Sequence, residues 1–174
     1  MKKIIALALS AALAISVLAG CGSSKGEQQE NTKTPEEMTE IYVDALEGAL
    51  DPEMLQINPV LSDAEDGDAP LILDVLGLKA DQMQAFGLSV SMMNIMAYGV
   101  AAVLPAEGQE EAVMEALNGF VDRQKQGFEH YLEDQYVIAK AAKVEKLEDG
   151  TLLLVMCEDQ DTVFEKISGT ILGK

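Results

Sequence analysis

Two side chains in the second half of the chain have the chemistry of a nucleophile or a base. A Ser-His-Asp or Cys-His arrangement would need His130, the only histidine, beside its nucleophile. His130 lies between Phe128 and Tyr131, whose side chains are typical of packing, so we expect a solvent-exposed or helix-end residue and no base. Cys157 closes the apolar run 152–157 and is predicted to be a buried, inert thiol.

The acidic segment 62–68, SDAEDGD, is the closest approach to a metal-binding loop. Acids beside a glycine are typical of calcium loops. However, Ser62 and Ala64 stand where an EF-hand supplies its first two ligands, and Leu73 replaces its closing glutamate. A zinc site needs three or four ligands, usually histidine and thiolate, and the chain has one histidine and, apart from Cys21, one cysteine. We therefore predict a solvated turn here and neither a metal nor another cofactor.

Two further chemistries have weaker support. Met92, Met93 and Met96 carry thioethers, which are soft ligands for copper(I), but methionines beside a strand more often fill a core, and we expect packing. The many carboxylates leave open a pair that hydrolyses glycosides, although no pair stands in a recognisable motif. The sequence also has no glycine-rich phosphate loop. We assign no catalytic residue.

The other cysteine, Cys21, stands in a different context. Residues 1–3 are positively charged and an apolar stretch follows over residues 4–17. This layout is typical of a secretory signal, and the stretch is shorter than the roughly 20 residues of a membrane-spanning helix. Residues 18–21, LAGC, resemble the lipobox of bacterial lipoprotein precursors. There the cysteine thiol takes a diacylglyceryl group, and the signal peptidase cleaves the bond before it.

We therefore expect residues 1–20 to be a lipoprotein signal peptide and Cys21 to be the lipidation site. Two acyl chains hold a protein on a membrane stably, whereas one binds marginally. Ordinary cleavage, or retention as an uncleaved anchor, is the alternative. The polar residues 22–34 have no aliphatic side chain and are predicted to be a flexible tether. The expected location is the extracytoplasmic face of the cell membrane.

Charge and composition exclude several partners. Removal of residues 1–20 takes Lys2 and Lys3 from the 12 basic residues and leaves 10 against 30 acidic ones, a net charge of −20. Such a surface repels polyanions, so we expect no nucleic-acid binding. The chain has no tryptophan and few other aromatic residues, which argues against an aromatic platform for carbohydrate. With Cys157 as the single cysteine besides Cys21, no internal disulfide is expected.

The sequence after residue 34 predicts helices and a few strands. Thr34, Pro35 and Glu37 supply the N-cap, first position and capping box of a helix, and Asp149-Gly150 predicts the tight turn of a hairpin. The other expected elements are irregular chain over 51–70, a short helix at 70–76 closed by Gly77, a turn or short helix at 80–86, a strand (or, alternatively, a helix) at 94–104, a main helix over 106–131, and a final helix capped by Asp159 or Asp161.

These elements predict a single α+β domain over residues 35–174. It would contain a small three-stranded antiparallel sheet with helices packed on one face. The apolar stripe of the main helix and the alternation of the hairpin strands each define a face that must be buried. We expect Phe120, Phe128 and Tyr131 to pack against Val144, Leu152 and Leu154, with Phe164 and Ile167 of the final helix closing the same core.

The order of these parts resembles a family of bacterial lipoproteins, domain of unknown function 4358. The resemblance covers roughly residues 36–170. A proline that commonly follows the tyrosine by two positions in the family is Glu133 here. The family has no assigned activity, so the resemblance implies architecture and anchoring without a mechanism. It rests on the lipobox, the predicted strand, the long helix with Arg123, Phe128-x-x-Tyr131, Gln135-Tyr136 and the glycine-turned hairpin 150–156.

The sequence thus favours a lipid-anchored envelope protein that acts through non-enzymatic binding or scaffolding, on an envelope protein or another ligand. The alternative is a small envelope hydrolase that uses carboxylates outside any recognisable motif. An enzyme of that kind would have a concave pocket lined by acids with perturbed protonation. The solute receptor of a transporter is disfavoured, because such receptors close two lobes around a cleft and this chain has the length of one.

Overall fold

The structure is a computed structural model that describes residues 33–174. The predicted signal peptide, the lipobox with Cys21 and nearly all of the tether lie outside the described residues. In the described part, no helix is both long enough and apolar enough to cross a membrane. The elements are α1 (Pro35–Ala49), α2 (Pro52–Ile57), α3 (Ala69–Leu76), the 3-10 helix η1 (Ala80–Gln82), β1 (Met83–Val90), β2 (Gly99–Pro105), α4 (Glu110–Phe128), α5 (Glu133–Ala141), β3 (Lys143–Lys146), β4 (Leu152–Met156) and α6 (Gln160–Leu172).

The predicted α+β class with an antiparallel sheet is confirmed, but the sheet has four strands and not three. Their order is β1-β2-β4-β3, and all neighbours are antiparallel. The missed strand is β1, the first half of which was expected to be a turn or short helix. Helix α1 packs closely on one face of β1, and that face therefore carries small residues: a Cβ atom added to Gly87 would lie 2.9 Å from Tyr42 Cβ. Small residues that alternate with large ones weaken the apolar signal of a strand.

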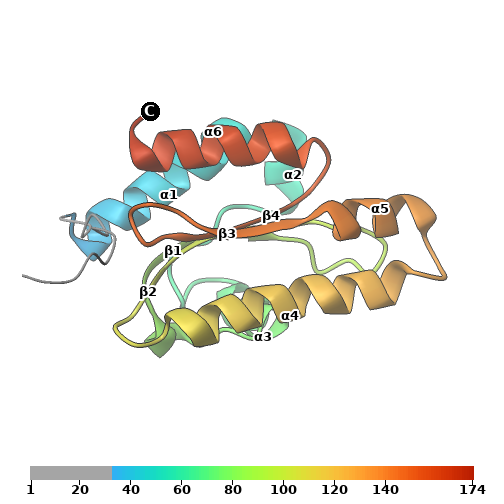
Figure 1. The fold of residues 1–174 in the computed structure, drawn as a ribbon, viewed down its shortest axis with the longest axis horizontal. Helices are drawn as coiled ribbons and strands as arrows, with labels where there is room; N and C mark the ends of the chain where they lie inside the picture. Colours follow the sequence, from blue (N-terminus) through green and yellow to red (C-terminus); the bar gives the residue numbers. More distant parts are fainter. Residues whose placement is uncertain (1–32) are drawn as a thin grey trace, which may run out of the picture.

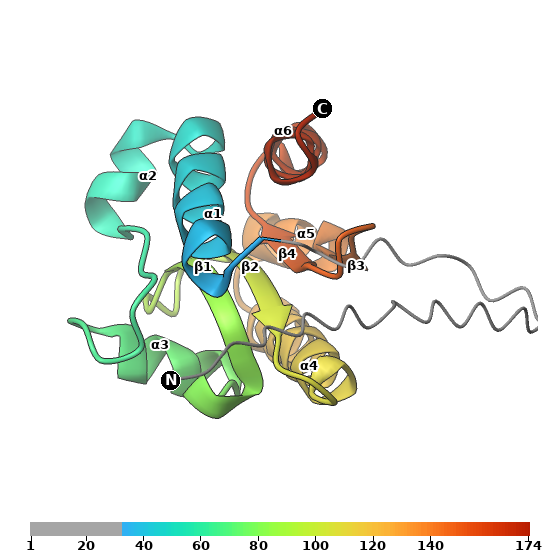
Figure 2. The same cartoon turned by 90° about the vertical axis from the view of Figure 1, so that its left-hand side faces the viewer.

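Helices cover both faces of the sheet, and the prediction of one covered face is wrong. Figures 1 and 2 show α1 and α6 on one side and α3 and α4 on the other. Strand β4 separates the two cores. Leu154 faces the core under α4, while its neighbours Leu153 and Val155 face the core under α1 and α6. All residues of β4 are buried, and a continuous apolar run is the sequence pattern of a strand buried on both faces.

The large apolar side chains therefore divide between two cores. Phe120 and Phe128 pack in the core that contains the hairpin residues Leu152 and Leu154, as predicted. Phe164 and Ile167 lie in the opposite core, so they do not close the same one. Tyr131 lies in neither core, because α4 ends at Phe128 and Tyr131 follows in a turn with 70% of its surface exposed.

The helix ends are formed by specific residues, most of them predicted. In the confirmed capping box of α1, the Glu37 amide donates to Thr34 Oγ1 at 3.2 Å and the Thr34 amide donates to Glu37 Oε2 at 2.8 Å. Gly77 closes α3 with a φ of 78°, a conformation that favours glycine. Asp159 occupies the N-cap position of α6, but its side chain accepts no capping hydrogen bond. The prediction that Asp159 or Asp161 caps this helix is therefore confirmed for the N-cap position of Asp159, but not for a hydrogen bond to its side chain.

Two helices were not predicted. Helix α2 begins after Asp51, whose Oδ1 accepts from the amides of Glu53 at 2.7 Å and Met54 at 3.4 Å. This cap and Pro52 at the first position form a short helix in a segment expected to be irregular. Helix α5 has only one fully buried position and no side-chain cap, so its sequence carries a weak helical pattern.

Candidate functional site

The structure keeps the two candidates for nucleophilic chemistry apart. The His130 side chain is 90% exposed in the turn after α4, and its Nε2 lies 3.9 Å from the Glu129 carboxylate. Cys157 is buried at the end of β4 and lines a pocket that His130 does not line. Both placements agree with the sequence predictions of an exposed or helix-end histidine and a buried thiol.

The two candidate metal segments also do not converge. Residues 62–68 form an exposed turn in which Asp63 Oδ1 accepts from the Glu65 amide at 2.9 Å. Met92 and Met93 are 52% and 40% exposed, so the prediction that they fill a core is wrong, because they lie in the loop beyond the end of β1. In the part of the chain that the structure describes, no three His, Cys, Asp or Glu side chains lie together as a metal site would require.

A pocket of about 700 Å³ opens at one end of the sheet. It lies at the C-terminal end of α1, and the 15 residues of that helix place it about 20 Å from residue 34. We call it the distal pocket for this reason. In Figure 1, α1 begins on the left, whereas α2, α5 and the start of α6 lie together on the right. The pocket is lined by residues 47–52, Met54, residues 96–98, Gln135, Ile138, residues 157–159, Thr162, Val163 and Lys166.

Hydrogen bonds fix the walls of the distal pocket. The Ala97 amide donates to Gln135 Oε1 at 2.8 Å, which ties the loop before β2 to α5. The same loop is closed by the Ser91 amide, which donates to the Tyr98 carbonyl at 3.1 Å. On the opposite wall, the Asp51 side chain caps α2. Hydrogen bonds donated by main-chain amides therefore hold both walls of the pocket.

The floor of the distal pocket is neutral. Tyr98 and Cys157 are buried there, and Ser89 Oγ, which donates to the Asn58 carbonyl at 2.7 Å, lies 2.9 Å from the Tyr98 hydroxyl and accepts from it. Burial raises the pKa of Tyr98 to about 12. Burial, with added repulsion from Asp159 and Glu158, also raises the pKa of Cys157 to about 12. Both groups keep their protons at neutral pH, and a protonated thiol is a poor nucleophile.

The rim of the distal pocket is negatively charged. Glu47, Asp51, Glu158 and Asp159 line it with exposed side chains. Lys166 is the one basic side chain among the described residues that line it. A neutral, partly apolar floor below a charged rim is an arrangement that binds and orients a ligand, and the volume falls in the usual range of about 300–1,000 Å³ for small-molecule sites.

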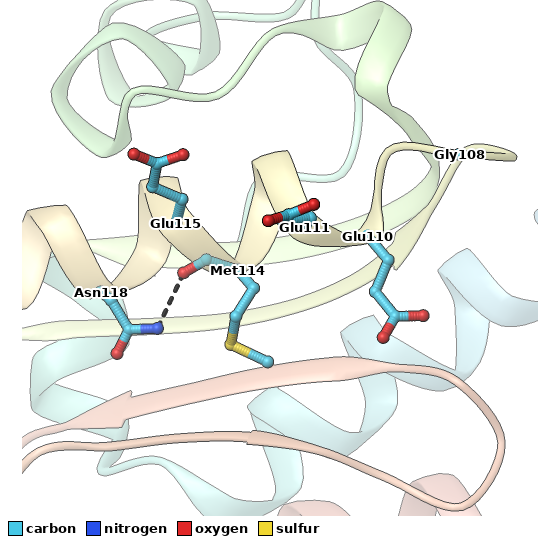
Figure 3. A pocket seen from close by; sticks show the side chains of 6 residues that line it. All are labelled: Gly108, Glu110, Glu111, Met114, Glu115 and Asn118. Carbon is cyan, nitrogen blue, oxygen red and sulfur yellow. Dashed lines mark hydrogen bonds between the residues drawn. The ribbon is translucent and has the colours of Figure 1, made fainter.

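A second hollow, of about 770 Å³, lies along the outside of α4. Figure 3 shows that its lining side chains come from this helix and the turn before it. Two of them already have partners: Glu110 pairs with Lys146 at 2.8 Å, and Asn118 Nδ2 donates to the Met114 carbonyl at 2.9 Å. Because its lining residues all come from one helix and the turn before it, this hollow has no opposing wall that would enclose a ligand.

Sequence reasoning missed the distal pocket because its residues are scattered. Residues 47–50 end the first helix, residues 51–54 fall in a segment that was expected to be irregular, and residues 96–98 fall inside a strand that was expected to begin at residue 94. Strand β2 begins instead at Gly99. Asp159 was considered only as a helix cap, and Glu158 was assigned no role. Nothing in the spacing of these residues indicates that they lie close together, because that depends on how α1 and α6 pack on the same face of the sheet.

The comparisons with known proteins give a family and nothing beyond it. The sequence model of the family described as "Domain of unknown function (DUF4358)" matches residues 60–157, which is more than half of the chain. No curated protein and no solved structure matches the chain significantly. The match begins after α2 and ends before α6. The distal pocket is therefore lined partly by the matched segment and partly by α1, α2 and α6, which lie outside it. The chain belongs to the family of this domain of unknown function, DUF4358.

Proposed function

We propose that the protein is a lipid-anchored domain on the extracytoplasmic face of the cell membrane that binds a ligand in the distal pocket and catalyses no reaction. The observation that carries this proposal is the position of the pocket at the end of α1 away from residue 33. Any anchor near the N-terminus joins the described part at residue 33. A site at the other end of α1 is free to meet ligands or proteins away from that anchor.

The anchoring part of the proposal rests on the sequence. Residues 18–21 resemble a lipobox, residues 1–17 have the layout of a signal peptide, and the resemblance to a family of bacterial lipoproteins points the same way. A diacylglyceryl group on Cys21 would supply the two acyl chains that stable membrane binding requires.

Two observations favour binding over hydrolysis. The thiol in the distal pocket is held in its protonated form by burial, and the described residues around it include no histidine that could take its proton. The Asp134 carboxyl has a pKa lowered by its hydrogen bond from Gln135, but Asp134 does not line the distal pocket. A general acid in a hydrolase needs the opposite shift, upward.

Methionine methyl groups provide a test that locates binding. Met54 and Met96 line the distal pocket, and Met114 lines the hollow on α4. The full chain, with isotope-labelled methionine methyl groups, would be screened by NMR against a fragment panel of cations, anions and neutral compounds. We expect some compounds to shift the Met54 and Met96 signals and to leave Met114 unchanged. A panel in which no compound of any charge shifts Met54 or Met96 would contradict the proposed binding function.

A further inference from the structure

We infer that the distal pocket binds small organic ammonium ions, with the ammonium group at the carboxylate rim and the apolar body against the floor. This inference rests on the proposed function, because it names the ligand class of the same pocket.

The rim carboxylates carry charge that the protein itself does not neutralise. In the described part of the chain, Glu47, Glu158 and Asp159 take part in no ion pair. Elsewhere among the described residues, four lysines pair with acids, as Lys143 does with Asp161 at 2.7 Å. The four acids and the single lysine of the pocket leave three negative charges in excess at its mouth. Such an excess attracts cations and repels anions.

The end of α1 adds to this field. Residues 47–50, which form its last turn and C-cap, line the pocket. The last turn contains no basic side chain, so the partial negative charge at the helix C-terminus is not compensated by the helix itself. Cations are favoured at helix C-termini. The backbone and the carboxylates therefore select the same sign of charge by independent means.

The walls select an organic cation over a metal ion. Met54, Met96 and Val163 are partly buried against the core under α1 and α6, and they present apolar surface between the rim and the floor. A metal ion requires several converging oxygen, nitrogen or sulfur ligands, and no three such acidic, histidine or cysteine side chains converge in the part of the chain described here. An ammonium group on an apolar body fits both the charge and the walls.

The loop beside the pocket extends the apolar surface. Ile95 is 54% exposed, and it shares the loop with Met92 and Met93, which are also exposed. This loop leads directly into the pocket residues 96–98. An exposed apolar loop next to a cavity is typical of a ligand-binding mouth, and here it offers contact for a body longer than the pocket itself.

Three compounds with the same phenyl body test the inference. Phenethylamine is cationic near neutral pH, phenethyl alcohol is neutral, and hydrocinnamate is anionic. Each would be titrated into the full chain with labelled methionine methyl groups. We expect phenethylamine to shift Met54 and Met96 at concentrations at least about threefold lower than the alcohol requires, with no pocket binding by hydrocinnamate.

Matched variants separate the charge effect from the pocket itself. The double variant Glu47→Gln, Glu158→Gln should weaken phenethylamine binding by about three- to tenfold. The control Glu111→Gln, Glu115→Gln removes the same charge from the hollow on α4 and should leave binding unchanged. Equal binding of all three compounds, or an equal loss in both double variants, would overturn the ammonium assignment and leave the pocket as a binding site. An absence of shifts at Met54 and Met96 with every compound would contradict both the inference and the proposed function.

Discussion

The Tyr42 hydroxyl lies 2.7 Å from the Thr151 hydroxyl, in a buried hydrogen bond that joins α1 to the start of β4. Thr151 Oγ1 donates to Asp149 Oδ2 at 3.0 Å, so Tyr42 is the donor to Thr151. Helix α1 lies outside the segment 60–157 that matches the family. This hydrogen bond therefore ties the flanking helix, and with it one wall of the distal pocket, to the matched part of the chain.

We predict that Thr151→Val destabilises the protein more than Tyr42→Phe does. The valine leaves the fully buried Tyr42 hydroxyl without an acceptor, which costs about 1–3 kcal/mol, whereas the phenylalanine removes the donor and costs about 0.5–1.5 kcal/mol. Urea unfolding measures both. Thr39→Val, at an exposed hydroxyl that donates to the Pro35 carbonyl, is the control, with an expected change within about 0.5 kcal/mol. A larger loss in Tyr42→Phe than in Thr151→Val would show that the assigned donor direction is wrong.

Close packing of α4 on the sheet gives a second prediction. A Cβ atom at Gly99 would lie 2.7 Å from Phe120 Cε1, and Phe120 is 1% exposed, so its ring has little room to move. Gly99→Ala should lower the free energy of unfolding by about 1–3 kcal/mol. Gly127→Ala is the matched control: it lies on α4 with open space around it and should stabilise by about 0.5–1 kcal/mol. Equal effects of the two variants on thermal unfolding would refute this packing.

The sequence predicted the elements whose signals are local. The capping box at Thr34 and Glu37, the glycine end of α3, the hairpin turn at Asp149-Gly150 and the apolar side of α6 all depend on residues within one element. The fourth strand, β1, was not predicted, because Gly87 and the small residues near it allow α1 to pack closely against the strand. That packing is a contact between segments that are distant in the sequence. The second core was not predicted, although the apolar run 152–157 indicates it. A strand that is apolar at every position must be covered on both faces.

The candidate site was less predictable than the fold. The exposure of His130 and the burial of Cys157 were predicted correctly from their neighbours. The distal pocket was not foreseen, because it combines residues from α1, α2, α5, α6 and the loop before β2, and their meeting depends on tertiary packing. Met92, Met93 and Ile95 were misjudged for a related reason: apolar side chains are typical of a core, but β1 ends at Val90 and β2 begins at Gly99, so these residues lie in an exposed loop.

Alkaline pH should destabilise the protein through Cys157. Burial raises the pKa of this thiol from 9.0 to about 12, so the folded state holds a proton that the unfolded state releases. This contribution to stability is complete below pH 9.0 and is lost as the pH rises from 9.0 toward 12. The free energy of unfolding should fall across this window less steeply in Cys157→Ala than in the unsubstituted chain. Burial also raises the pKa of Tyr98 and of Tyr42, so these two hydroxyls account for the decrease in stability that remains in the variant. Parallel pH curves would contradict the burial of the thiol.

Membrane attachment should depend on Cys21. We predict that the unsubstituted protein partitions into the detergent phase of a phase-separation experiment and that Cys21→Ala loses both acylation and processing before residue 21. Cys157→Ala removes the other thiol and should partition as the unsubstituted protein does. If Cys21→Ala were processed and membrane-bound as before, the lipidation of Cys21 would be disproved.

The most direct test of the account fills the distal pocket. Gly48 lines the pocket on α1, and no atom lies within 4 Å of a Cβ added there, so Gly48→Trp places an indole at the mouth without a clash at its Cβ. Gly127→Trp is the matched control on an exposed position of α4 outside the pocket. Phenethylamine would be titrated into both variants and the unsubstituted chain by calorimetry. The account predicts a loss of affinity of about tenfold or more in Gly48→Trp and an unchanged affinity in Gly127→Trp. Binding to Gly48→Trp as tight as binding to the unsubstituted chain would contradict the distal pocket as the binding site.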